Sequence, residues 1–341
     1  MRRGRTIAFA VLCVVCALAA GAYVRRAMRR AERADSLVAT AAVTDQGRPE
    51  LPGTTVLFRS TAMDTSYGRL ALAAIADPSR RHLVSTLSCE RVDFAGGRGV
   101  CLTAARGVVT TYAAVIFGQD FQPLFTLALA GAPSRVRVSA DGAFAAVTVF
   151  VNGHSYGGDF STVTSIIDLR RGDYVVPNLE QLTVWRGAEH FEAVDRNFWG
   201  VTFARNPNTF FATVGSGGRT YLIEGALGER EAKIVHDAVE CPSLSPDNRR
   251  VAFKRRTDNA VGPVRWRLSV LDLDSQRDFA LAETRSVDDQ VAWLDNDRVM
   301  YALPNAESGT AETTTWVVPA GGGGEPAVLV PLASSAVIWS P

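Results

Sequence analysis

The chain has 341 residues, of which 47% are apolar and 21% are charged. This composition is too apolar for a disordered chain and sufficient for a large buried core. Because 36 basic and 35 acidic residues leave a net charge of +1, no overall electrostatic field favours a nucleic acid as partner.

The first predicted element is an uncharged apolar segment at residues 6–24, preceded by Arg2, Arg3 and Arg5. Its length of about 19 residues is enough to span a bilayer. Small residues near its end also fit a signal-peptidase site, so secretion after cleavage is the alternative. Because five arginines follow within residues 25–33, we expect an uncleaved transmembrane anchor in residues 1–24.

Two arguments disagree on the orientation of this anchor. Three arginines and the amino terminus precede the segment and five arginines follow it, so the positive-inside rule favours a cytoplasmic body. A family resemblance and a pair of cysteines in one expected hairpin favour a body outside the cytoplasm, which is the placement we expect. Residues 25–53 are predicted to form a helical stalk and linker that ends in the Pro- and Gly-containing stretch 46–53.

From residue 54 onward, short runs of Val, Ile, Phe, Thr and Tyr alternate with turn residues, which is typical of an all-β fold. The sequence also repeats itself. Residues 136–147 (VRVSADGAFAAV) align with 242–253 (PSLSPDNRRVAF), and each segment predicts a strand, a tight turn and a strand. A third strand follows in each copy, at 166–172 and at 270–276. The period of roughly 45–55 residues is that of the four-stranded blades of a β-propeller.

The two ends of this region predict how the ring closes. Residues 336–341 (AVIWSP) match the first strand of a blade and then stop, whereas 54–59 (TTVLFR) match a second strand. We therefore expect residues 54–341 to form six blades, the first closed by strands from both ends, because such closure removes two exposed sheet edges. The expected blades are 54–88 with 334–341, 89–131, 132–190, 191–238, 239–286 and 287–333.

Residues 244–253 (LSPDNRRVAF), followed by 268–273 (LSVLDL), resemble the WD40-like blade repeat of the TolB-like propeller family, as do 316–322 (WVVPAGG). With its single apolar segment and residues 197–203 (NFWGVTF), the whole chain is similar to the membrane-anchored TolB-like proteins of actinobacteria. The resemblance implies a six-bladed propeller that binds proteins in the cell envelope. It does not carry over the partners of TolB, because the N-terminal α/β domain of that family is replaced here by the anchor.

One motif argues for an enzyme. Residues 153–158 (GHSYGG) match the Gly-x-Ser-x-Gly pattern around a nucleophilic serine, which here is Ser155. That pattern requires a helix after the serine, but residues 159–169 predict a strand. We therefore interpret the motif as a loop between strands and expect no catalytic residue.

Other chemical readings are weaker. Asp272, Asp274 and Asp278 flank a predicted hairpin, where Asp is a common turn residue, so a calcium site is the less favoured interpretation. The four histidines show no spacing suited to a shared metal. We predict no metal site and no cofactor.

The usual binding place of a propeller is the mouth of its central channel, lined by residues that precede or begin each innermost strand. The alternative interpretation is that these residues are solvated and merely end the strands. The expected mouth residues are Glu90, Arg91, Arg135, Asn197, Trp199, Glu240, Asp288, Asp289 and Gln290.

Cys89 and Cys101 are expected to form a disulfide, since a hairpin turn centred near Ala95 would place them opposite each other. A turn centred on Gly96 and Gly97 would instead slip the register and separate the two cysteines. Cys241 begins a blade across the channel and is expected to be a buried free thiol.

These observations predict a non-catalytic, membrane-anchored, extracytoplasmic propeller that binds a protein or a cell-envelope component at its channel mouth, with no nucleic-acid partner. The alternative function is a propeller-based hydrolase or lyase that acts on a peptide or a glycan.

Overall fold

The computed structural model describes residues 13–16, 18–22, 25, 51–151, 161–257, 264–305 and 310–340. Residues 13–16 and 18–22 are helical. Within the described ranges, no helix is both long enough and apolar enough to cross a membrane. Much of the expected anchor at 6–24 and residues 26–50 of the expected stalk lie outside these ranges.

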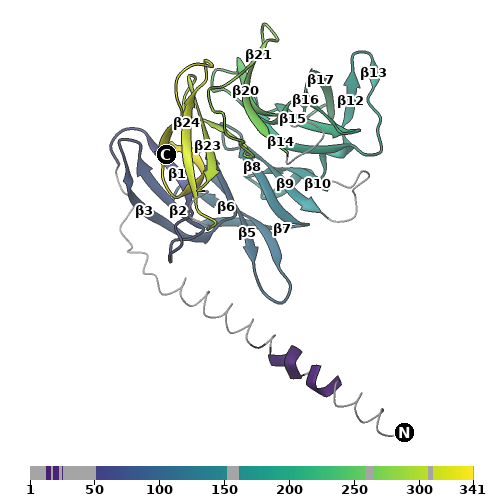
Figure 1. The fold of residues 1–341 in the computed structure, drawn as a ribbon. Coiled ribbons are helices and arrows are strands. Elements are labelled where there is room, and N and C mark those ends of the chain that lie inside the picture. The colour runs from purple at the N-terminus through teal and green to yellow at the C-terminus, as the bar shows by residue number, and fades with distance from the viewer. Residues whose placement is uncertain are drawn as a thin grey trace, which may run out of the picture.

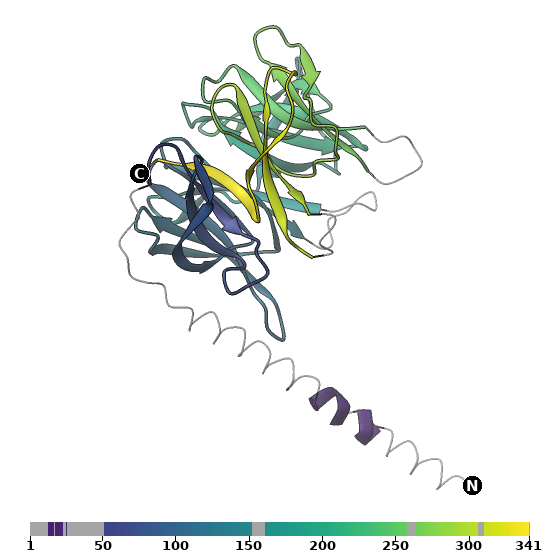
Figure 2. The ribbon, with the colours of Figure 1, turned by 60° about the vertical axis from the view of Figure 1, so that its left-hand side comes forward.

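Six sheets arranged around a centre form a six-bladed β-propeller, and all their strand pairs are antiparallel except one in the fourth blade (Figures 1 and 2). From the channel outward, the first three blades are β26 (Ala333–Trp339), β1 (Thr55–Ser60), β2 (Arg69–Ala74) and β3 (Asp77–Ser88); β4 (Arg91–Ala95), β5 (Arg98–Ala105), β6 (Thr111–Gly118) and β7 (Pro123–Leu129); and β8 (Ala132–Val138), β9 (Phe144–Val151), β10 (Ser161–Asp168) and β11 (Asp173–Val176). The last three are β14 (Asn197–Phe203), β15 (Thr209–Ser216), β16 (Arg219–Ala226) and β17 (Glu231–Asp237), with β12 and β13 added outside; β18 (Glu240–Leu244), β19 (Arg250–Arg256), β20 (Trp266–Asp272) and β21 (Asp278–Ala280); and β22 (Ala292–Trp293), β23 (Arg298–Pro304), β24 (Thr313–Pro319) and β25 (Ala327–Val330).

The first blade is closed by strands from both ends of the propeller, as the repeat predicts. β26 pairs antiparallel with β1, with Val56 opposite Ile338 and Leu57 opposite Val337. All six residues of β1 are buried, because the strand lies between β26 and β2. The ring therefore depends on pairing between segments almost 280 residues apart in sequence.

The boundary between the third and fourth blades differs from the expectation. β12 (Thr183–Arg186) and β13 (Glu189–His190) follow a short 3₁₀ helix (Leu179–Gln181) and belong to the sheet of the fourth blade. β12 lies parallel to β17, the outer strand of that blade. The expected third blade at 132–190 is therefore too long, because its last segment pairs with a strand that comes 48 residues later, Thr183 lying opposite Glu231.

Apolar side chains fill the interfaces between adjacent blades, and these interfaces are unequal. Within the part of the chain that the structure describes, the core between the fourth and fifth blades holds seven buried apolar residues, including Phe211, Val239 and Phe253. The core between the third and fourth blades holds sixteen. The thinner core leaves space near one end of the interface between the fourth and fifth blades, where a cleft lies.

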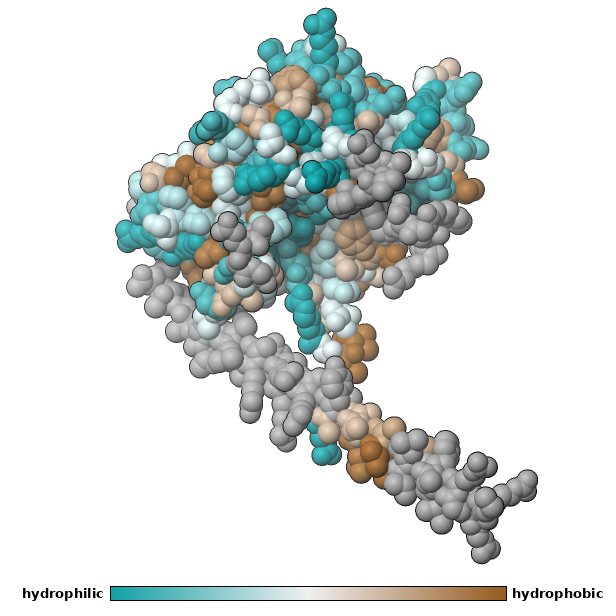
Figure 3. All heavy atoms as spheres, in the orientation of Figure 1, coloured by the Kyte–Doolittle hydropathy of each residue, from teal (hydrophilic) through white to brown (hydrophobic). Residues whose placement is uncertain are grey.

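On the face seen in Figure 3, hydrophilic side chains predominate and apolar ones are scattered among them. The exposed apolar residues of the structure include Val108 and Val109 at the tip of the β5–β6 hairpin, which are 74% and 75% exposed. Scattered apolar groups are common on folded proteins, so their distribution on this face marks no binding surface.

The first hairpin of the second blade turns at Gly96 and Gly97, both with positive φ, because Ala95 pairs with Arg98. The turn centred near Ala95 is therefore wrong. Two glycines that accept positive φ make a tight turn whose twist suits a β-hairpin. The register shifts accordingly, and Cys101 lies opposite Val92 instead of Cys89.

The two cysteines are nevertheless joined by a disulfide, with Cα atoms 5.3 Å apart. The reason is that Cys89 lies just before β4, where its N–H donates to the carbonyl oxygen of Gly68 in the first blade at 2.8 Å. The chain enters the second blade from this point, and the side chain of Cys89 reaches Cys101 across the bend. Cys241 is buried and has a free thiol.

Candidate functional site

The nine residues expected at the channel mouth do not all meet. They separate into a central charged cluster, a cleft between the fourth and fifth blades, and a surface ion pair of Glu90 with Arg106 at 2.6 Å. The central cluster contains Arg91, Arg135, Asp288, Asp289 and Gln290, and the cleft contains Asn197, Trp199 and Glu240.

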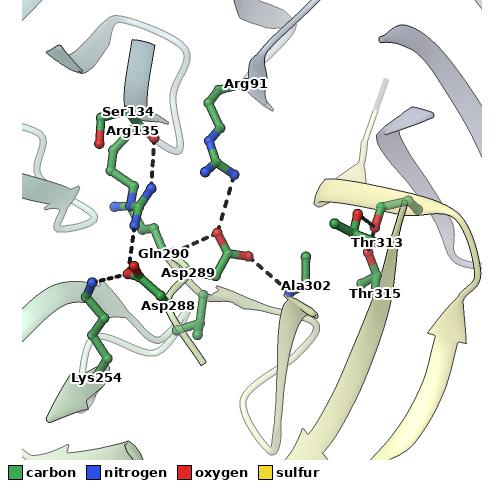
Figure 4. Close-up of polar contacts among 12 residues, drawn as sticks. Arg91, Ser134, Arg135, Lys254, Asp288, Asp289, Gln290, Ala302, Thr313 and Thr315 are labelled. Atoms are coloured by element: carbon green, nitrogen blue, oxygen red, sulfur yellow. Dashed lines mark hydrogen bonds and ion pairs between the residues drawn. The ribbon is translucent and has the colours of Figure 1, made fainter. Parts of the chain in front are cut away.

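Figure 4 shows the central cluster, in which Arg91 and Arg135 point from two blades toward the carboxylates of the loop before β22. Arg91 pairs with Asp289 at 3.5 Å, and Arg135 pairs with Asp288 at 3.4 Å. The ammonium group of Lys254, on β19, also contacts Asp288. Each acid is thus shared with cations from other blades, so the charges of the cluster largely compensate one another.

Hydrogen bonds hold the acidic loop in place. The Asp289 carboxylate accepts from the backbone N–H groups of Gln290 at 2.9 Å and Ala302 at 3.0 Å. The amide Nε2 of Gln290 donates to the carbonyl oxygen of Val201 at 3.0 Å. These contacts connect the sixth blade to the fourth across the channel.

The pKa shifts in the central cluster agree with a network of paired charges. Burial acts to raise the pKa of Asp288, but the charges of Lys254, Arg135 and Arg91 outweigh it and lower the pKa. Burial lowers the pKa of the Arg91 guanidinium, and nearby Arg135 adds to this effect.

The space inside this cluster is a cavity of about 30 Å³, lined by Arg91, Arg135, Arg137, Asp289 and Gln290 among others. That volume holds one or two water molecules. This cavity is therefore too small for an organic ligand.

Backbone bulges position the cleft residues. The pairing of β14 shifts after Trp199, where Gly200 has φ of +65°, and the pairing of β18 shifts after Glu240, where Cys241 has φ of +49°. A side chain on Gly200 would lie 2.5 Å from the Cα atom of Cys241, so only glycine allows the two bulges to pack together. Bulges redirect neighbouring side chains, and these two lie beside the cleft.

The cleft has a volume of about 770 Å³ and lies at the end of the fourth and fifth blades where β14 and β18 begin. Aromatic rings on its walls come from three strands: Trp199, Tyr221 and Trp266. The β15–β16 turn at 215–220 and the connection at 237–240 form the rest of its rim. A cleft of this size with a few polar groups is typical of ligand sites.

Glu240 is the buried acid of the cleft, with 6% of the residue exposed. It lies opposite Lys254 in the β18–β19 pairing. Burial raises the pKa of Glu240 to about 7, because it outweighs the opposing charge of Lys254. The carboxyl is therefore about half protonated at neutral pH.

The central cluster and the cleft also contain residues that are not among the nine expected ones. Lys254, Tyr221 and Trp266 come from second and third strands, whereas the expectation considered only the innermost strand of each blade. A usable signal was Lys254 itself, one of two lysines among 36 basic residues, at the end of an apolar strand pattern.

The Gly-x-Ser-x-Gly motif at 153–158 lies outside the described residues. The segment after it is β10 (Ser161–Asp168), the expected strand. Of the acids flanking the β20–β21 hairpin, Asp272 accepts from the N–H and hydroxyl of Ser275, as a turn residue does, and Asp278 pairs with Arg255.

No protein-family model matches the sequence, and no curated protein matches it.

Solved structures share the fold. TolB from Acinetobacter baumannii is 14% identical, with a TM-score of 0.51 over 84% of this chain and 69% of that one. A puromycin-hydrolysing peptidase of Mycobacterium tuberculosis is 13% identical, with a TM-score of 0.50 over 84% of this chain and 45% of that one. A chain of a nidogen–laminin complex is 9% identical, with a TM-score of 0.54 over 84% and 98%. At these identities the similarity is one of fold.

Proposed function

We propose that this chain is a non-catalytic binding protein that holds a component of the cell envelope in the cleft between its fourth and fifth blades. The observation that carries the proposal is the cleft itself, which combines about 770 Å³ of space, three aromatic residues and the buried carboxyl of Glu240. The central cluster has a structural role in this proposal, because its charges are paired and its cavity holds one or two waters.

The similar folds support binding as a role for this architecture. One of them belongs to a complex of nidogen with laminin, and another is TolB. Because a shared fold does not transfer a ligand, the proposal rests on the residues of the cleft.

A capture experiment tests this function. Cross-linking and pull-down from intact membranes should recover a ligand with the wild-type chain, and Trp199→Ala or Arg219→Glu should reduce recovery at least fivefold, because both residues line the cleft. The matched controls are Trp185→Ala, on β12, and Arg249→Glu, an exposed arginine at the opposite end of the fifth blade. Equal loss in the control variants would argue against the cleft.

We further propose that the propeller is extracytoplasmic and anchored in the membrane by residues 6–24. Supporting this placement, Cys89 and Cys101 form a disulfide and are almost completely buried. Disulfides persist in oxidising compartments and are rare in the cytosol.

Peptide mapping without reductant tests the placement. A linked peptide with both cysteines is expected from the native protein, and an alkaline phosphatase fused after residue 341 should be active. Replacing both cysteines by serine should lower the free energy of unfolding by about 3 kcal/mol, the chain-entropy value for a loop of this length. Alkylation of Cys89, Cys101 and Cys241 without reductant would contradict the placement.

A second candidate function is a hydrolase or lyase that acts on a peptide or a glycan. The observation that favours it is the pKa of Glu240, which burial raises to about 7, the range suited to acid–base catalysis at neutral pH. Incubating the chain with an oligosaccharide that it binds separates the two functions. Cleavage of that oligosaccharide that Glu240→Gln abolishes would establish the enzyme.

A further inference from the structure

Most of the charged groups that line the cleft have partners. Arg186 pairs with Asp237 at 3.5 Å, and its guanidinium lies 4.7 Å from the ring centre of Tyr221. Asp195 accepts hydrogen bonds from the hydroxyl of Ser216 at 2.6 Å and from the N–H of Gly217 at 2.7 Å. These walls therefore combine an ion pair and a hydrogen-bonded carboxylate with aromatic surface.

Glu240 is the buried charged group of the cleft, whereas Arg219 on the rim is exposed. Glu240 is nine-tenths buried and lines the cleft, yet its carboxyl makes no hydrogen bond to any residue that the structure describes. The carboxyl oxygens are not among the fully buried side-chain atoms that lack a partner, so they keep contact with the space of the cleft. A ligand in that space can therefore donate a hydrogen bond to them.

The charged groups around Glu240 narrow the chemistry of that ligand. They are Lys254, Arg256 and Arg135, which are cations, and Asp288, which is an acid. An ammonium group placed at the carboxyl would be repelled by the three cations, and an anion would be repelled by Glu240 and Asp288. A hydroxyl group avoids both costs, since it donates to the carboxylate and accepts from the protonated acid.

Two indole rings supply the apolar part of the site. Trp199 and Trp266 both line the cleft and are half-buried. A side chain on Gly215 would lie 2.6 Å from the Trp199 ring, so the glycine allows the indole to lie against β15. Aromatic faces of this kind pack on the apolar C–H faces of sugar rings while the polar rim meets the hydroxyls.

We infer that the cleft binds a neutral oligosaccharide, whose ring faces pack on Trp199 and Trp266 and one of whose hydroxyl groups hydrogen-bonds to the Glu240 carboxyl. The inference rests on the proposed function and names the ligand class of the same site.

Calorimetric titration of the full chain, in a detergent without a sugar headgroup, tests the inference. The neutral probes are cellotetraose, maltotetraose and triacetylchitotriose; the charged probes are chitotriose, a cation, and trigalacturonate, an anion. At least one neutral probe is expected to bind at least tenfold more tightly than both charged probes.

Variants assign the binding to the named residues. Trp199→Ala and Glu240→Leu should each weaken the neutral probe at least tenfold, whereas Glu240→Gln should stay within threefold of wild type, because the amide still forms hydrogen bonds. Trp185→Ala is the matched tryptophan control and should leave affinity unchanged. Thermal melts of each variant separate lost binding from lost folding.

Other outcomes overturn the inference. Tighter binding of a charged probe would do so, as would failure of all three neutral probes at millimolar concentration. If no sugar binds but a protein is captured in a Trp199-dependent way, the inference falls and the proposed function stands. If Trp199→Ala affects no capture of any kind, both fall.

Discussion

Deleting residues 333–341 is expected to abolish cooperative unfolding and to cause aggregation. The deletion removes β26, the innermost strand of the first blade, and leaves the buried strand β1 as an open edge. It also removes Trp339, whose ring centre lies 4.2 Å from the ring centre of Phe94 and 4.8 Å from that of Phe121. The lost burial and pairing are comparable with the entire net stability of a domain, about 5–15 kcal/mol.

Scanning calorimetry and size-exclusion chromatography measure this effect. The milder variant Trp339→Ala should lower the free energy of unfolding by about 3–5 kcal/mol, the usual cost of truncating a buried tryptophan. Deletion of residues 340–341 alone is the control and should melt like the full chain. A 333–341 deletion that also melts like the full chain would show that the ring does not depend on closure by β26.

Glu240→Gln is expected to become more stable relative to wild type as the pH rises from 5 to 8. The pKa of Glu240 is 4.5 in its ordinary state and about 7 in the folded protein. Between these values the folded state binds more protons than the unfolded state, so the wild type loses stability as the pH rises. The shift corresponds to about 3 kcal/mol, and the glutamine variant lacks this loss.

Urea denaturation at pH 5 and pH 8 measures the difference. Glu231→Gln, at an exposed position on β17 of the neighbouring fourth blade, is the matched control and should show no pH-dependent difference from wild type. A constant stability difference between Glu240→Gln and wild type at both pH values would mean that the carboxyl titrates as an exposed group.

Most of the fold was predictable from the repeat, because each blade is a local unit of hairpins whose strand and turn signals recur. The closure of the ring could be predicted because residues 336–341 match the first strand of a blade and no second strand follows them. The errors involve pairings that local signals do not determine. β12 has an ordinary strand composition, but its partner is β17 of the next blade. The partner of Cys101, which is Val92 instead of Cys89, depends on whether the turn is centred on Ala95 or on Gly96 and Gly97.

The candidate site was predictable only as a set of positions. The positions at which the innermost strands begin were enough to identify Trp199, Glu240, Arg91 and Arg135. They did not show that the first two lie in the cleft and the last two in the central cluster. That separation depends on the bulges at 200 and 241, and on Lys254, which lies next to both places. Bulges and contributions from outer strands arise from packing between blades, which a single repeat unit does not encode.

Photo-crosslinking in intact cells tests the central claim, that the ligand occupies the cleft between the fourth and fifth blades. A benzophenone side chain at Thr220, on the cleft rim, is compared with one at Glu229, at the opposite end of the same blade. A crosslinked product is expected from position 220, and it should be absent from position 229 and lost on adding Trp199→Ala. Equal products from both positions, or a product only from position 229, would contradict the central claim.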